Sequence, residues 1–148
     1  MLCVKNGVAD LYNVGDSRIY LLRNGVLTQL SKDHTIVQQK LDLGAIAAEQ
    51  AASDSGRHKL TQHLGIFESE MLIEAHHIQK QVQPDDVFLL CSDGLTDMVS
   101  DKAICQILII AKSCDEAAEK LLEAALENGG KDNVSVIVVN AKRVMFGL

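Results

Sequence analysis

Short runs of apolar residues, separated by turn residues, occupy the first thirty positions and recur in the second half of the chain. The continuous apolar run at 87–91 is typical of a strand buried on both faces, and 134–139 is rich in β-branched residues. Asn24-Gly25 lies between two such runs and predicts a β-hairpin, because both residues tolerate positive φ. The predicted strands cover 2–4, 9–14, 18–23, 26–30, 71–78, 87–91 and 134–139.

Helical spacing of apolar residues marks the stretches between these strands. The spacing in 34–43 predicts a helix, and 45–57 predicts a short helix followed by a mobile stretch. Ser100 can cap a third helix, and Ser113-Cys114-Asp115-Glu116 is a capping-box pattern that begins a fourth. Strands before and after a block of helices predict an α+β fold, and the length fits one domain, residues 1–148.

Composition narrows the classes of protein that this fold can belong to. Of 148 residues, 47% are apolar and 23% charged, as in an ordinary globular protein. The net charge of −6 disfavours a nucleic-acid binder, because phosphate backbones are bound by Lys and Arg clusters. No apolar run is long enough to span a bilayer, and the first residues do not resemble a signal peptide. We therefore expect a cytoplasmic protein with neither a nucleic-acid nor a membrane partner.

Three turns place an aspartate beside a glycine at the end of a predicted strand. These aspartates are Asp16, Asp93 and Asp132. Each of these turns taken alone needs no functional explanation, because Asp and Gly are ordinary turn residues. Strand ends packed in one sheet can nevertheless bring carboxylates together, and such a cluster is costly unless a cation neutralises it. Oxygen ligands of this kind suit Mg²⁺ or Mn²⁺.

Four segments of the sequence carry motifs in a fixed order that spans nearly the whole chain. They are Val14-Gly15-Asp16-Ser17-Arg18-Ile19-Tyr20, Leu60-Thr61-Gln62-His63-Leu64-Gly65, the stretch 86–97 with Ser92-Asp93-Gly94 at its centre, and Gly130-Lys131-Asp132-Asn133-Val134-Ser135. In this order they resemble PPM-type (2C-like) metal-dependent protein Ser/Thr phosphatases, with bacterial members nearest in style. The resemblance implies a four-layer α-β-β-α sandwich, in which an antiparallel β-sandwich is flanked by helices.

The resemblance also implies a set of metal ligands. Asp93 and Asp132 match the aspartates that hold a two-metal centre of Mn²⁺ or Mg²⁺. Asp16 and Asp97 match residues of a further, weaker metal site. The implied activity is hydrolysis of phosphoserine or phosphothreonine in proteins by a metal-activated water, so that no side chain is itself the nucleophile. The implied partner is a phosphoprotein substrate, the product of a Ser/Thr kinase.

Other residues of these motifs have supporting roles by resemblance. Asn133 is expected beside the metal centre, where it would orient Asp132, and Ser92 and Gly94 are the further supporting residues. Arg18 is expected to pair with a nearby carboxylate or carbonyl rather than to act on substrate.

The remaining candidates for chemistry have simpler structural interpretations. His76 and His77 are adjacent in a predicted strand, so their rings point to opposite faces and do not chelate one metal. His34 and His63 are expected to make local hydrogen bonds. Cys91 is expected to be a core residue, and the four cysteines are not expected to form a disulfide framework.

Three motifs of the phosphatase family do not occur in these 148 residues: the N-terminal acidic segment, Asp-Gly-x-x-Gly-His and the phosphate-binding Arg. We therefore expect a partial sandwich equivalent to the C-terminal portion of the domain, with N-terminal strands missing and sheet edges open to self-association. Little or no phosphatase activity is expected of the chain alone. The alternatives are a non-catalytic module that binds a partner or regulates an intact paralogue, and a fragment without a role of its own.

Overall fold

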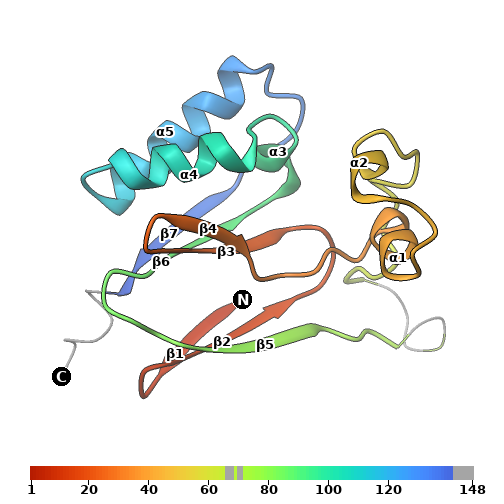
Figure 1. Cartoon of the computed structure of the whole chain (residues 1–148), viewed down its shortest axis with the longest axis horizontal. Helices are drawn as coiled ribbons and strands as arrows, with labels where there is room; N and C mark the ends of the chain where they lie inside the picture. The colour runs from red at the N-terminus through yellow and green to blue at the C-terminus, as the bar shows by residue number, and fades with distance from the viewer. Residues whose placement is uncertain (66–68, 70–71, 142–148) are drawn as a thin grey trace.

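Two stacked antiparallel sheets form the body of the protein in the computed structural model, which describes residues 1–65, 69 and 72–141 (Figure 1). The smaller sheet has the strand order β1-β2-β5 and the larger the order β4-β3-β6-β7. Their strands are β1 Leu2–Lys5, β2 Val8–Asn13, β3 Arg18–Arg23, β4 Val26–Gln29, β5 His76–Gln81, β6 Val87–Cys91 and β7 Val136–Asn140.

Helices lie on one face and at one end of this sandwich. Those with described bounds are α1 Ile36–Asp42, α2 Ala48–Ala51, α3 Asp93–Thr96, α4 Asp101–Ile110 and α5 Cys114–Glu127. The helices α4 and α5 cover the outer face of the larger sheet, whereas α1 and α2 project to one side (Figure 1). The antiparallel sandwich with flanking helices confirms the predicted α+β class. Within the described residues, no helix is long and apolar enough to cross a membrane.

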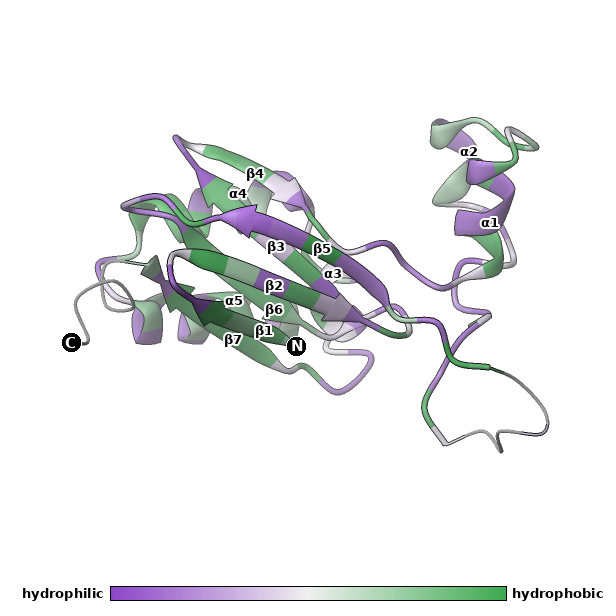
Figure 2. Ribbon diagram, turned by 90° about the horizontal axis from the view of Figure 1, so that it is seen from below, coloured by the Kyte–Doolittle hydropathy of each residue, from purple (hydrophilic) through white to green (hydrophobic). Residues whose placement is uncertain are grey.

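The larger sheet is apolar on both faces, as the continuous run at 87–91 predicts. Toward α4 and α5, Tyr20 and Leu89 pack with Leu121 in one buried cluster. Toward the smaller sheet, Leu21 and Phe88 pack in a second cluster with residues of β1, β2 and β5. Figure 2 shows the mostly hydrophobic colouring of β1 and the mostly hydrophilic colouring of β5 within the smaller sheet. The central strands β3 and β6 therefore connect the two cores, which fixes the register of the whole sandwich.

The predicted helix starts are confirmed, with one correction. Ser100 accepts a hydrogen bond from the Ala103 amide, as an N-cap should. Ser113 likewise accepts from the Glu116 amide at 3.1 Å. The Glu116 carboxylate, however, accepts from the Lys112 amide at 2.8 Å rather than from Ser113. The capping box is therefore half formed, because the Glu116 carboxylate binds the amide of the residue before the N-cap instead of the N-cap amide.

Two predicted boundaries in the middle of the chain are wrong. The strand expected at 71–78 is β5, which begins at His76 and ends at Gln81; position 71 lies outside the described residues. Only alternate residues of this mostly polar edge strand are partly buried, so its pairing with β2 depends on the backbone rather than on an apolar pattern. The turn expected after β6 contains the short helix α3.

A buried ion pair joins the turn before β6 to β3. The Asp86 side chain is 1% exposed and accepts from Arg23 Nε at 2.8 Å and from Arg23 Nη2 at 2.7 Å. The same carboxylate accepts from the Gln83 amide at 2.8 Å, which closes the turn. Arg23 Nη2 also donates to the Gln81 carbonyl at 2.8 Å, so this one cluster links β5, β6 and β3.

We expect Asp86→Ala to lower the free energy of unfolding by about 2–4 kcal/mol, because it leaves Arg23 and the Gln83 amide without their acceptor. Chemical denaturation monitored by circular dichroism measures the loss. The control is Asp42→Ala, which removes an exposed pair with Lys32 and should cost less than about 1 kcal/mol. Equal losses in the two variants would contradict the role given to Asp86.

Candidate metal centre

A polar cavity of about 490 Å³ lies between α3, the turn after β2 and the α1–α2 segment. Five carboxylates and two guanidinium groups line it: Asp16, Asp33, Asp93, Asp97, Asp101, Arg18 and Arg57. Of the four predicted metal ligands, Asp16, Asp93 and Asp97 are brought together here. The chain thus folds so that one cavity collects predicted ligands from the turn after β2 and from α3 with its C-cap.

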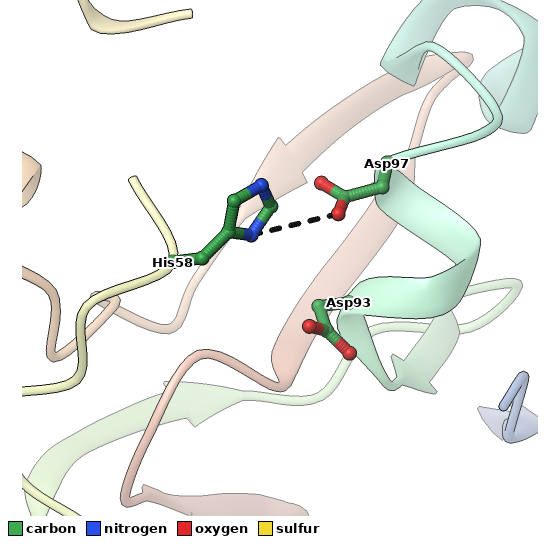
Figure 3. A group of neighbouring side chains, drawn as sticks. All are labelled: His58, Asp93 and Asp97. Atoms are coloured by element: carbon green, nitrogen blue, oxygen red, sulfur yellow. Dashed lines mark ion pairs between the residues drawn. The ribbon is translucent and has the colours of Figure 1, made fainter. Parts of the chain in front are cut away.

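The helix α3 presents Asp93 and Asp97 on the same face, because residues four apart are neighbours on a helix. A histidine that the sequence analysis did not single out, His58, faces them from across the cavity (Figure 3). One ligand atom from each of the three residues lies within 4.8 Å of the others. Among the described residues, the Asp93 carboxylate has no hydrogen bond or ion pair, which leaves it available to a ligand.

Asp97 is the most heavily engaged member of this group. Its Oδ1 accepts from Arg57 Nη2 at 2.6 Å, and its Oδ2 lies 3.6 Å from His58 Nδ1. Arg57 and His58 were not predicted, because an Arg-His pair in an irregular segment has no periodic or motif signal. They come to α3 only through the tertiary fold.

Backbone hydrogen bonds place this Arg-His pair. The Ile36 amide donates to the Lys59 carbonyl at 2.9 Å, and the Thr61 amide donates to the His34 carbonyl at 2.8 Å. His34 in turn donates its amide to the Gly15 carbonyl at 2.9 Å, while its Nδ1 accepts from the Gly15 amide. His34 makes a hydrogen bond, as expected, but its partner Gly15 lies 19 residues away along the chain rather than nearby. The bond links residues 57–61 to the turn that carries Asp16.

The cavity disfavours the ionised form of the Asp16 carboxyl. Partial burial raises the pKa of the Asp16 carboxyl, and the negative charge of Asp93 raises it further. A carboxylate cluster with this property favours a bound cation, since a positive charge would restore the ionised form of Asp16.

Two other carboxylates in the cavity already have partners. Arg18 donates to Asp33 through Nε at 3.0 Å and Nη2 at 2.7 Å, which confirms the structural pairing expected of Arg18. Arg18 also donates to the Tyr20 hydroxyl, which donates to Asp101 at 3.0 Å. Asp33 and Asp101 are therefore held by this network rather than left open to an ion.

Asp132 is not among the residues that line the cavity. Its Oδ1 accepts from the Asn133 amide at 2.7 Å, so within the described residues Asn133 holds Asp132 through the backbone rather than through its side chain. The place of Asp132 in a two-metal centre with Asp93 stays a prediction.

The predicted supporting residues join the turn at Asp93 to the turn at Asp132. Ser92 Oγ donates to the Asn133 carbonyl at 3.1 Å and accepts from the Ser135 amide at 3.0 Å. A Cβ on Gly94 would lie 2.3 Å from the Asn133 carbonyl oxygen, closer than any side chain can be accommodated. Gly94 is therefore required by this backbone approach, not by an unusual φ angle.

The remaining candidates are structural, as expected. His77 Nε2 lies 2.9 Å from Asp10 Oδ1, and its ring stacks on Tyr12 with centroids 4.3 Å apart. His63 Nδ1 lies 3.1 Å from the Leu64 carbonyl. Cys91 is buried in the core, where burial raises the pKa of its thiol to about 12.

Comparison with known proteins supports the resemblance to metal-dependent Ser/Thr phosphatases that the sequence motifs indicate. The family described as protein phosphatase 2C matches residues 66–134. The Ser/Thr protein phosphatase PstP of Mycobacterium tuberculosis is 42% identical over 137 residues, which are 93% of this chain and 26% of PstP. The Ser/Thr phosphatase stp of Listeria innocua is 37% identical over 135 residues, 91% of this chain and 52% of that protein.

Solved structures agree with the sequence comparison. The M. tuberculosis PstP/Ppp phosphatase superposes with a TM-score of 0.84 at 40% identity, covering 93% of this chain and 56% of that one. The sequence and the fold are those of the C-terminal portion of a PPM-type Ser/Thr phosphatase domain. A second structure of this PPM-type group, the PstP catalytic domain in complex with two manganese ions, has a TM-score of 0.78 at 39% identity and covers 93% of this chain and 55% of that one. The chain spans between a quarter and about half of the length of the curated relatives that it matches.

We expect Gly94→Ala to lower the free energy of unfolding by about 1–3 kcal/mol, because the added methyl forces the Asn133 carbonyl away from α3. Thermal or chemical denaturation measures the change. The control is Thr96→Ala in the same short helix, which removes a hydrogen bond of 3.3 Å to the Asp93 carbonyl and should cost less than about 1 kcal/mol. A Gly94→Ala variant as stable as the unsubstituted chain would refute the close approach.

Proposed function

We propose that this chain carries the cation-binding residues of a metal-dependent phosphatase that acts on phosphoserine and phosphothreonine in phosphoproteins made by a Ser/Thr kinase. The observation that carries the proposal is the convergence of Asp16, Asp93 and Asp97 on one cavity. The Ser/Thr phosphatases that the chain resembles support the same activity, and the manganese complex of PstP favours Mn²⁺, with Mg²⁺ as the other candidate.

The donor set fits a divalent ion. Asp93 and Asp97 would hold the ion from α3, and Asp16 would approach from the turn after β2. Asp132 would complete the set, oriented by the Asn133 amide. Ions bound here would neutralise the phosphate group and lower the pKa of a bound water so that it can attack phosphorus.

A second candidate function is a non-catalytic module that binds a partner. The observation that favours it is the ion pair between Arg57 and Asp97, which satisfies one predicted ligand without any metal. A cavity that this ion pair stabilises can persist without a metal ion and bind a partner. The test of function therefore measures cation binding and phosphate release separately.

We expect the 148-residue chain to bind Mn²⁺ weakly, with a dissociation constant of about 0.1–1 mM, because few carboxylates contribute. Asp93→Asn should weaken binding at least tenfold in isothermal titration, whereas Asp42→Asn on the surface should leave it unchanged. Release of phosphate from a phosphothreonine peptide should be slow, and it should require both Mn²⁺ and Asp93.

The outcomes of this experiment separate the two functions. Mn²⁺ binding that depends on Asp93, with even slow release of phosphate, supports the phosphatase. The same binding with no release favours the non-catalytic module. Mn²⁺ binding that Asp93→Asn leaves unchanged would refute the cation site itself.

We also propose that the open side of the sandwich mediates self-association. β1 and β7 are edge strands, and Met1 and Ile137 line one cavity of about 260 Å³ between the sheets. The Ser135 carbonyl accepts from the Ser92 amide, and the Ala141 amide donates to the Asp86 carbonyl. By the alternation of an antiparallel ladder, the backbone groups of Val136 and Val138 then point away from β6, toward the open edge. Ile137 is 59% exposed although it belongs to the inter-sheet face.

We expect the chain to elute as a dimer or larger species in size-exclusion chromatography with light scattering, because unpaired edges bind further strands. Ile137→Lys should shift it to the monomer, since a charged edge residue opposes pairing. Leu43→Lys, at a residue that is 83% exposed next to α1, is the matched control and should leave the size unchanged. A monomeric unsubstituted chain would exclude this association.

A further inference from the structure

His58 completes a three-residue group with Asp93 and Asp97 that no sequence motif indicates (Figure 3). It belongs to the segment after α2, which the backbone hydrogen bonds of Lys59 and Thr61 hold against the start of α1. The His58 side chain is 56% exposed, so its position does not result from burial in a core. Its ring is directed across the cavity toward α3.

The distances within this group suit a shared ion better than a hydrogen bond. His58 Nδ1 and Asp97 Oδ2 are 3.6 Å apart, which is long for a hydrogen bond. Two donors that each bind one ion at about 2.1 Å lie about 3–4 Å from each other. The limit of 4.8 Å for the whole group is close to that spacing, so a small rotation of the side chains suffices.

The orientation of Asp97 leaves one oxygen for such an ion. Arg57 occupies Oδ1 at 2.6 Å, whereas Oδ2 faces His58. The guanidinium group therefore fixes the carboxylate plane and leaves Oδ2 as the free donor. Asp93, whose carboxylate has no hydrogen bond or ion pair within the described part of the chain, supplies the third donor.

We propose that His58 is a direct ligand of the divalent ion held between Asp93 and Asp97, and that its imidazole gives this position a preference for Mn²⁺, Co²⁺ or Zn²⁺ over Mg²⁺. The inference rests on the proposed cation site and specifies its third donor. Mg²⁺ prefers sites made of oxygen and retains its waters, whereas imidazole suits the transition metals. A site of two carboxylates and one imidazole therefore discriminates between these ions.

Isothermal titrations of the full 148-residue chain with CoCl₂, MnCl₂ and MgCl₂ test the proposal. The expected result for His58→Ala is a loss of Co²⁺ affinity of at least tenfold, with a change in Mg²⁺ affinity below about twofold. His58→Gln, which keeps a polar side chain without a ring nitrogen, should show the same loss for Co²⁺. The visible absorption bands of bound Co²⁺ should also change in both variants, because the nitrogen ligand is removed.

The control is His63→Ala, a histidine outside the cavity lining, which should leave all three affinities unchanged. Circular dichroism melting curves should match for all variants, since the His58 side chain is largely exposed. Losses of Co²⁺ and Mg²⁺ affinity by the same factor would overturn the assignment of His58 as a ligand.

An Asp93→Asn variant separates failure of the cation site from failure of the role given to His58. If Asp93→Asn leaves every cation affinity unchanged, the proposed cation site fails. If Asp93→Asn weakens binding but His58→Ala keeps the ratio of Co²⁺ to Mg²⁺ affinity, only the role of His58 fails.

Discussion

The close approach of two turns at one end of the larger sheet is the constraint on which the candidate metal centre depends. Gly94 lies against the Asn133 carbonyl, and the Ser92 hydroxyl bonds to the backbone on either side of Val134. These contacts align the end of β6 with the start of β7 and set the direction in which α3 leaves the sheet. The orientation of the Asp93 carboxylate therefore follows from packing of the backbone, before any ion is considered.

Electrostatics separates the structural carboxylates from those available to a ligand. Asp33 and Asp86 each accept two or more hydrogen bonds from an arginine, and their charges are compensated within the fold. Asp16 and Asp93 have no such partner in the described residues, and the pKa of Asp16 is raised. A raised pKa means that ionised Asp16 opposes folding: this cost is absent below the pKa of the unfolded chain and fully present at neutral pH. A bound cation would remove that cost.

The sequence is informative wherever the signal is local. Asn24 and Gly25 both adopt positive φ, of 51° and 77°, as an Asn-Gly hairpin requires, and the serine caps of α4 and α5 could be identified from residue type and spacing. The motifs predicted Asp16, Asp93, Asp97 and Asp132 as metal ligands, and the first three of these line one cavity whereas Asp132 does not. His58 could not, because it approaches Asp97 only after hydrogen bonds fold the α1–α2 segment back on itself, and no periodicity in the chain encodes that contact.

The net charge of the cavity limits how many ions it needs before it can accept a phosphate group. Its five carboxylates and two guanidinium groups give a charge of −3 with histidine neutral. One divalent ion leaves the cavity at −1, which still repels a phosphate dianion, whereas two ions bring it to +1. Arg57 contributes to this balance, since without its charge two ions would only reach neutrality. By this count the cavity attracts a phosphate group only after two divalent ions have bound, which is the condition that the proposed activity requires.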